Sequence, residues 1–193
     1  MRIVTTTILA LLAGMTVAAS FEVVSPSEAR YRVRERVLGV PLANDAVGIT
    51  GTLSGSIVLE ADGDTAVSGE VNVDLTGLVS DQPRRDAYVH EEALETERYP
   101  SATFSVSEVR GLPRPPPTDG EFDVIIAGQL TVRDFSLPIS WSGTASFDGA
   151  DVHLDAATTL TFEELGLERP RVGVLVTVSE EITLEVSIRL RRR

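Results

Sequence analysis

The alternation of apolar and polar residues is the sequence feature that most constrains how this chain folds. Between positions 67 and 75, for example, Glu70, Asn72 and Asp74 stand between apolar residues. Successive side chains of a β-strand point to opposite faces, so this pattern predicts strands with one buried face. The pattern recurs in eight stretches, at 29–37, 47–59, 67–75, 102–109, 122–132, 137–147, 152–162 and 182–190.

One helix interrupts the predicted strands. Pro83 suits the first turn of a helix, Ser80 or Asp81 can cap it, and Tyr99-Pro100 ends the segment. Eight strands in up-and-down order with one inserted helix predict an all-β chain that closes into an antiparallel barrel. We expect the helix to cover one end of that barrel.

An eight-stranded barrel is either a soluble protein or a small outer-membrane protein, and alternation alone does not separate the two. A membrane barrel carries aromatic girdles, whereas this chain has one Trp, three Tyr and six Phe. The polar face carries charged residues, such as Arg30, Arg32 and Arg34, for which an eight-stranded interior has little room. We therefore expect a soluble barrel with its charges outside and an apolar lumen.

The first twenty residues have the pattern of a secretory signal peptide. Arg2 precedes an apolar run at 8–17, and small residues follow at 18–20. The chain has no cysteine, so it has no site for a lipoprotein anchor. We expect cleavage near residue 20, a barrel domain at 21–193, and a periplasmic or secreted location.

Composition and motifs argue against several classes of function. The net charge of −12 argues against nucleic acid as a partner. There is no cysteine, no glycine-rich phosphate loop and no triad-like arrangement, so we expect no enzyme and no cofactor. His90 and His153 have no second ligand at metal spacing, which predicts solvent-exposed histidines and no metal site.

Two carboxylates, Glu35 and Glu108, fall on the inward side of otherwise apolar strands. An unpaired carboxylate there is costly, so each lies at a wet rim or pairs with an arginine such as Arg85 in the mouth of the barrel. If the chain were an isomerase or cyclase acting on a lipid, these two groups would be its acid and base. Several glycines, such as Gly51 and Gly143, also face inward, where they bend the strands or leave space for a ligand.

Two segments resemble the hallmarks of a known family. Residues 84–89 (RRDAYV) with 97–104 (ERYPSATF), and residues 128–138 (GQLTVRDFSLP), are similar to the signatures of the YceI-like family. The resemblance covers about 24–190. It implies a lipocalin-like barrel, export, and binding of a polyisoprenoid chain in a long apolar tunnel.

We therefore predict a lipid-binding carrier or buffer whose lumen holds an isoprenoid such as a polyprenyl chain or quinone. The alternative is a secreted structural or stress-related barrel without a ligand. The predicted ligand-binding residues are Tyr31, Val33, Leu53, Ile57, Val73, Arg85, Phe104, Val106, Phe122, Val124, Ile126, Ile139, Trp141, Leu154, Leu160, Ile182 and Leu184.

Two further expectations concern the outer parts of the barrel. At one end, Arg85 and Asp86 hold the helix by charged hydrogen bonds while Tyr88 or Val89 faces the lumen. At the seam, the first and last strands are antiparallel neighbours, which predicts a stripe of arginines with Glu185 as partial counterion and peripheral contact with an anionic membrane. The arginines of that stripe are Arg30, Arg32, Arg34, Arg189, Arg191 and Arg193.

Overall fold

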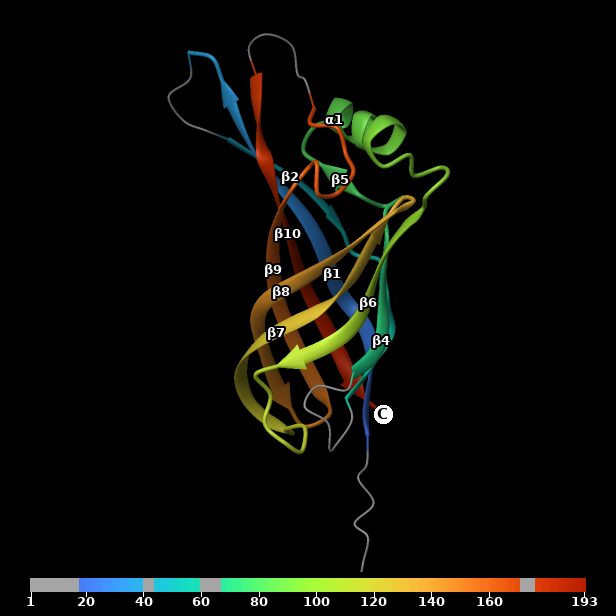
Figure 1. The fold of residues 1–193 in the computed structure, drawn as a ribbon, viewed down its shortest axis with the longest axis vertical. Coiled ribbons are helices and arrows are strands. Elements are labelled where there is room, and N and C mark those ends of the chain that lie inside the picture. The colour runs from blue at the N-terminus through green and yellow to red at the C-terminus, as the bar shows by residue number, and fades with distance from the viewer. Residues whose placement is uncertain (1–17, 40–43, 60–66, 171–175) are drawn as a thin grey trace, which may run out of the picture.

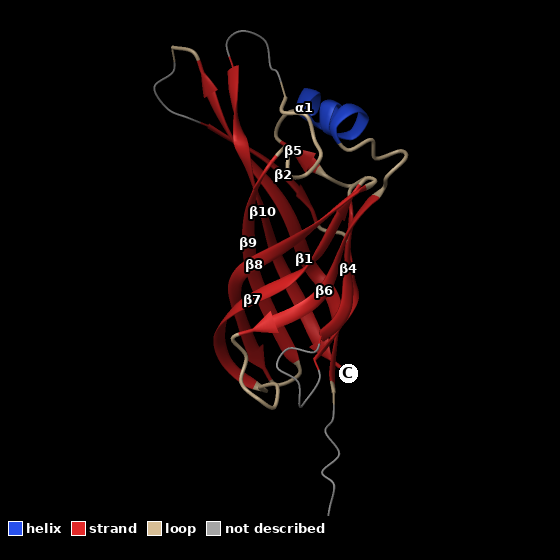
Figure 2. Ribbon diagram, viewed as in Figure 1, coloured by secondary structure: helices blue, strands red, loops and turns tan. Residues whose placement is uncertain are grey.

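The computed structural model describes residues 18–39, 44–59, 67–170 and 176–193. Residues 1–17, which make up most of the expected signal peptide, lie outside this part. The chain forms long antiparallel strands and one short helical segment (Figures 1 and 2). The elements are β1 (Ala19–Val37), β2 (Asn44–Thr50), β3 (Leu53–Leu59), β4 (Val67–Asp74), β5 (Val79–Ser80), α1 (Pro83–Tyr88), η1 (Val89–Ala93), β6 (Ser101–Arg110), β7 (Asp119–Val132), β8 (Phe135–Asp148), β9 (Asp151–Thr161) and β10 (Val176–Arg192).

The strands close into the predicted eight-stranded antiparallel barrel. The sheet runs from β10 through β9, β8, β7, β6, β4 and β3 to β1, and pairing between β1 and β10 closes the ring. β1 pairs with β3 over Ala19–Glu22 and with β2 over Ala29–Glu35. The expected second strand at 47–59 is therefore broken at Gly51-Thr52 into two strands that share one neighbour.

The first strand begins ten residues earlier than the alternation predicts. Ala19 and Phe21 already lie in the core, with 5% and 3% of their surface exposed. The alternation fails at 25–27 because the register slips there, and the Ser27 hydroxyl donates to the Val24 carbonyl. β1 thus starts within the segment expected to be cleaved, and the cleavage site near residue 20 stays a prediction.

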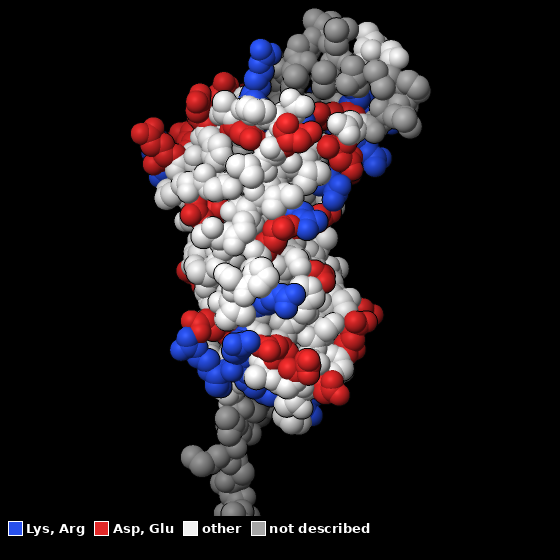
Figure 3. Space-filling model, turned by 180° about the vertical axis from the view of Figure 1, so that it is seen from behind, with Lys and Arg blue, Asp and Glu red and all other residues white. Residues whose placement is uncertain are grey.

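The longer first strand changes the register at the seam, and the predicted arginine stripe is wrong. Arg191 lies opposite Glu22, and Arg30 lies opposite Glu185. Glu185 does act as a counterion, since it accepts a hydrogen bond of 3.1 Å from Arg32 Nε. Acidic side chains therefore lie beside basic ones at the seam. Figure 3 shows both signs of charge on one face, with basic side chains gathered near its lower end.

A bulge in β6 overturns the inward placement of Glu108. The register between β6 and β7 shifts between Val106 and Glu108, so two residues of β6 stand against one of β7. Glu108 consequently faces outward and binds Arg110 at 2.6 Å. Val109 packs against the core in its place.

The helical segment begins at Pro83, as predicted, but its cap differs. Gln82 is the capping residue and makes no side-chain cap bond, so the expected cap at Ser80 or Asp81 is wrong. Ser80 instead accepts a hydrogen bond from the Gln82 amide at 3.2 Å. In the described part of the chain, no helix has the length and hydropathy needed to cross a membrane.

Neighbouring strands pair with one another around the lower part of the barrel. In the upper part, some neighbouring strands separate. β8 and β9 pair only from Ser142/Ala157 to Asp148/Asp151, although both strands continue upward. Pro138 pairs with β7 but lies in the part of β8 that has no partner on the β9 side, and its lack of an N–H suits such an edge. On the other side, β2 makes only a two-residue ladder with β5. Non-strand segments must therefore complete the upper wall.

The closeness of β8 and β9 below the split gives a stability prediction. A Cβ at Gly143 would lie 2.0 Å from the Asp155 carbonyl oxygen, whereas one at Gly51 would lie 3.7 Å from its nearest atom, the Ser27 carbonyl oxygen. We expect Gly143→Ala to lower the free energy of unfolding by about 1–3 kcal/mol because backbone must move. Gly51→Ala should change it by less than about 0.5 kcal/mol. Urea unfolding of both variants tests this; equal losses would contradict it.

Candidate functional site

A cavity of about 670 Å³ occupies the upper half of the barrel. This volume lies within the range of about 300–1,000 Å³ that is typical of small-molecule pockets. Its wall is mostly apolar. The predicted residues that line it are Tyr31, Val33, Ile57, Val73, Arg85, Phe104, Val106, Ile126, Trp141, Leu154, Ile182 and Leu184.

The lower half of the barrel is filled. The ring of Phe147 packs edge-on against Phe21 and Phe122, with ring centroids 6.3 Å and 6.0 Å apart. The cavity is therefore a blind pocket, not a tunnel through the whole barrel. Five predicted residues pack in or against the hydrophobic core and do not line the cavity: Leu53, Phe122, Val124, Ile139 and Leu160.

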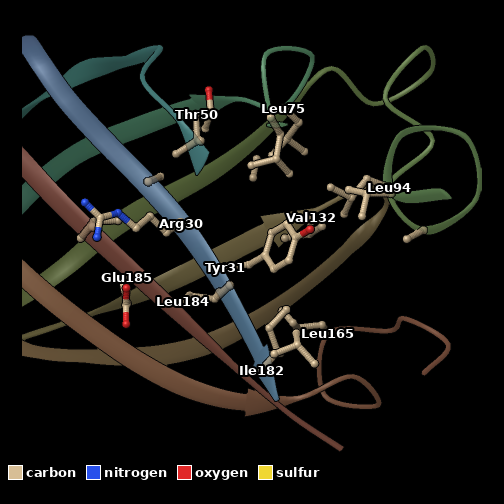
Figure 4. Close-up of a pocket in the computed structure, with 18 of the residues that line it drawn as sticks. Arg30, Tyr31, Thr50, Leu75, Leu94, Val132, Leu165, Ile182, Leu184 and Glu185 are labelled. Carbon is tan, nitrogen blue, oxygen red and sulfur yellow. The ribbon is translucent and has the colours of Figure 1, made fainter. Parts of the chain in front are cut away.

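The roof of the cavity comes from two segments that lie outside the barrel strands. One is the helical segment with the approach to it, which contributes Leu78, Tyr88 and Leu94. The other is the turn 162–170 after β9, from which Phe162 and Leu165 line the pocket. Figure 4 shows Leu165 in the pocket wall. Leu165 is 3% exposed. The expectation that Tyr88 or Val89 faces the lumen is confirmed, since both line the cavity.

Arg85 ties the helical part of the roof to the barrel wall. Its guanidinium lies 3.3 Å from the Glu35 carboxylate and 2.6 Å from that of Asp81. The side chains of Arg85 and Glu35 are 17% and 19% exposed. The pairing of Glu35 with Arg85 is thus confirmed, whereas Glu108 lies outside, so the structure does not bring the two carboxylates together.

Asp86 strengthens the same attachment through Ser80. Asp86 Oδ1 accepts hydrogen bonds from the Ser80 amide at 2.9 Å and from its hydroxyl at 2.6 Å. Ser80 belongs to β5, which pairs with β2. The expected hold on the helix by Arg85 and Asp86 is therefore present.

The far end of the helical segment is held by Arg133, in the turn between β7 and β8. Its guanidinium pairs with Glu95, donates to the Ala93 carbonyl at 3.2 Å and lies over the Tyr99 ring, 5.8 Å from its centroid. The two sequence signatures thus meet at the roof.

His90 lies between the two attachments and is half-buried. Its Nε2 contacts the Leu78 carbonyl at 2.8 Å, so the expectation of a solvated surface histidine is wrong.

Tyr31 projects from β1 into the cavity (Figure 4). Burial raises the pKa of its phenol from 10.0 to about 12. The Arg85 guanidinium opposes the rise, and the carboxylates of Asp86, Glu35 and Asp81 add to it. Tyr31 therefore keeps its proton at any physiological pH.

Comparison with known proteins agrees with this geometry. A family model described as the YceI-like domain matches residues 23–190. A polyisoprenoid binding domain from Saccharophagus degradans, implicated in plant cell wall breakdown, is similar with a TM-score of 0.67 and 12% identity; 90% of this chain and 98% of that chain are covered.

Two other solved structures share the fold. BcnA of Burkholderia cenocepacia has a TM-score of 0.62 at 14% identity, with 84% of this chain and 95% of that chain covered. A YceI protein of Campylobacter jejuni has a TM-score of 0.57 at 13% identity, with 76% and 84% covered. The search of curated proteins gave no match.

The raised pKa of Tyr31 gives a prediction for alkaline pH. Burial also raises the pKa of Tyr88, so the titration is made in a Tyr88→Phe background. There we expect one phenol of the folded protein to ionise near pH 12 in an ultraviolet titration, and this step to vanish in Tyr31→Phe but persist in Tyr99→Phe. Because the folded pKa lies above the unfolded value, the contribution of Tyr31 to stability is complete below about pH 10 and is lost as the pH rises through about 12. A late step that survives in Tyr31→Phe would contradict the assignment.

Proposed function

The chain belongs to the YceI-like family, and on this premise we propose that its barrel binds a long apolar isoprenoid chain as a carrier or buffer. The observation that carries the proposal is the blind, apolar cavity of about 670 Å³ in the upper barrel. A barrel with only a structural role gains stability from filling this space, because voids cost packing energy. The name of the Saccharophagus degradans domain supports the same class of ligand.

The cavity volume sets the length of chain that fits inside. A carbon with its hydrogens takes about the volume of a water molecule in the liquid, ~30 Å³. The cavity then holds about 20 carbons, or roughly four isoprene units. A longer chain leaves its remainder outside the barrel.

The energy of binding suits exchange better than permanent storage. Burial of about 20 carbons at ~0.8 kcal/mol each gives a gross term of about 16 kcal/mol relative to water. A bilayer offers the chain an environment that is equally apolar. The net preference for the barrel is therefore small, as a carrier requires.

The remaining parts of the proposal concern the place where the protein works. We infer export to the periplasm or beyond from the leader-like sequence at 1–20. Peripheral contact with an anionic membrane stays a prediction. It is now supported by the apolar ligand class, since such ligands reside in bilayers, and no longer by an arginine stripe.

A bulky side chain that occupies part of the cavity should weaken binding of the ligand. Ala156 lines the cavity on β9, while its neighbour Ala157 is exposed. Ala156→Phe should weaken binding of a four-unit isoprenoid about tenfold or more, because loss of about two buried carbons already costs ~1.6 kcal/mol. Quenching of Trp141, the single tryptophan of the chain, reports occupancy. Ala157→Phe is the matched control and should bind normally; equal effects of both variants would refute a ligand site in the lumen.

Release of the ligand should depend on the attachment of the roof. Arg85→Ala removes the contacts to Glu35 and Asp81, which we expect to speed ligand release about five- to tenfold. Glu91→Ala is the control, because Glu91 is exposed on the same helical segment and is not among the residues that line the cavity. Stopped-flow transfer to acceptor vesicles measures the rate. Unchanged release from Arg85→Ala would show that this end of the roof does not gate the cavity.

A further inference from the structure

A chain that is longer than the cavity must leave the barrel somewhere, and it cannot leave through the bottom. The lower half is filled around Phe147. One way out is the edge of the roof, where Arg85 contacts Glu35 and Asp81. An apolar chain that passes these ions takes them out of water, which costs free energy. The other way out is the wall between the upper parts of β8 and β9.

That wall is closed by side chains and not by a backbone ladder. In the described strands, β8 and β9 pair only from Ser142 and Ala157 downward, although both continue upward, and we call the unpaired part the split. Ile139 of β8 is buried in the core, and Leu160 of β9 packs against it; neither lines the cavity. Rotation of these two side chains opens the wall without breaking a ladder between the strands.

The split runs from the level of the cavity up to the roof. At its foot, Trp141 and Ala156 line the cavity beside the last paired residues. At its top, the turn 162–170 spans it, since a Cβ at Gly166 would lie 2.9 Å from Cγ of Phe135, the first residue of β8. When this turn opens, the split joins the mouth of the cavity, so a chain can enter sideways and need not thread through the wall.

The outer border of the split is uncharged among the residues that the structure describes. By contrast, the outward positions of β1 carry Arg30, Arg32 and Arg34. A chain that leaves through the split therefore covers hydroxyl, methyl and proline groups, and it strips no ion of water. The outward residues that flank the split are Ser136, Pro138, Ser140, Ala157, Thr159 and Thr161.

We propose that the tail of a long isoprenoid leaves the cavity through the wall between the upper parts of β8 and β9 and lies along this uncharged border. Ile139 and Leu160 are then the residues that determine whether long chains bind. The site consequently accepts isoprenoids that are much longer than its volume alone allows. This inference rests on the proposed function, because it takes the cavity to be an isoprenoid site.

Single cysteines can report the path of the tail, because the chain has no cysteine of its own. Ser140→Cys places a thiol on the border of the split, Ser54→Cys on the exposed face of β3, and Arg84→Cys at the rim of the cavity. Each full-length variant is loaded with geranylgeraniol, which has about the length that the cavity holds, or with solanesol, a similar alcohol with more than twice the chain. Native mass spectrometry confirms loading, and the rate of maleimide labelling measures how far each thiol is covered.

We expect solanesol to slow the labelling of Ser140→Cys about five- to tenfold relative to geranylgeraniol, because a covered thiol reacts slowly. Ser54→Cys, the matched control, should react equally with both alcohols bound. Extra protection of Arg84→Cys by solanesol, with none at Ser140→Cys, would show exit through the roof and overturn the inference while the isoprenoid site stands. If neither alcohol binds the unmodified chain, the proposed function fails, and this inference with it.

A second variant tests the two side chains that close the wall. Leu160→Trp should weaken solanesol binding about tenfold and leave geranylgeraniol binding unchanged, because only the long chain crosses the wall. Leu53→Trp is the control, since Leu53 packs against the same core from β3 and does not line the cavity either. Equal losses of solanesol binding in both variants would contradict an exit through this wall. Binding of geranylgeraniol but not of solanesol to the unmodified chain would contradict it as well.

Discussion

The long antiparallel ladder between β1 and β10 is the constraint on which the rest of the molecule depends. It joins the two ends of the described chain from Phe21 and Arg192 at the bottom to Val37 and Val176 at the top. Closure removes the two free sheet edges and turns one face of every strand toward a common interior. Only because the ring is closed do apolar side chains from distant strands, such as Trp141 and Ile57, face the same space.

The site exists because that closure is incomplete above the middle of the barrel. If β8 and β9 stayed paired to their ends, and β2 had a full neighbour, the strands would draw together and side chains would fill the interior, as they do around Phe147. The split keeps the walls apart and leaves a cavity that other segments must cover. The helical segment and the turn 162–170 supply that cover with apolar side chains below and charged ones around the rim.

The sequence predicts the barrel and much of the cavity wall, because both follow from side-chain parity along strands. Parity fails wherever the register slips, and so Glu108 was placed inward although a bulge after Val106 turns it out. Parity also gives no information on how far along the barrel axis a residue lies. For this reason it predicts Phe122 at the ligand, whereas Phe122 packs against the core at the lower end of the barrel. Leu165, which forms part of the roof, lies in a turn outside the alternating stretches of the sequence. It reaches the site only because the fold places this turn over the cavity.

The two roof segments differ in how they are attached, and this difference bears on how a ligand enters. The helical segment is tied to β1 through Arg85 and to the β7–β8 turn through Arg133. The turn 162–170 makes its described backbone hydrogen bonds within itself, to Thr161 of β9 and to β10, and Arg169 pairs with Glu180 at 3.0 Å. Local opening follows the segments with the fewest bonds to the rest of the fold. Opening of the roof therefore leaves the barrel ladder intact, and the turn 162–170 lies beside the edges of β8 and β9 that do not pair with each other.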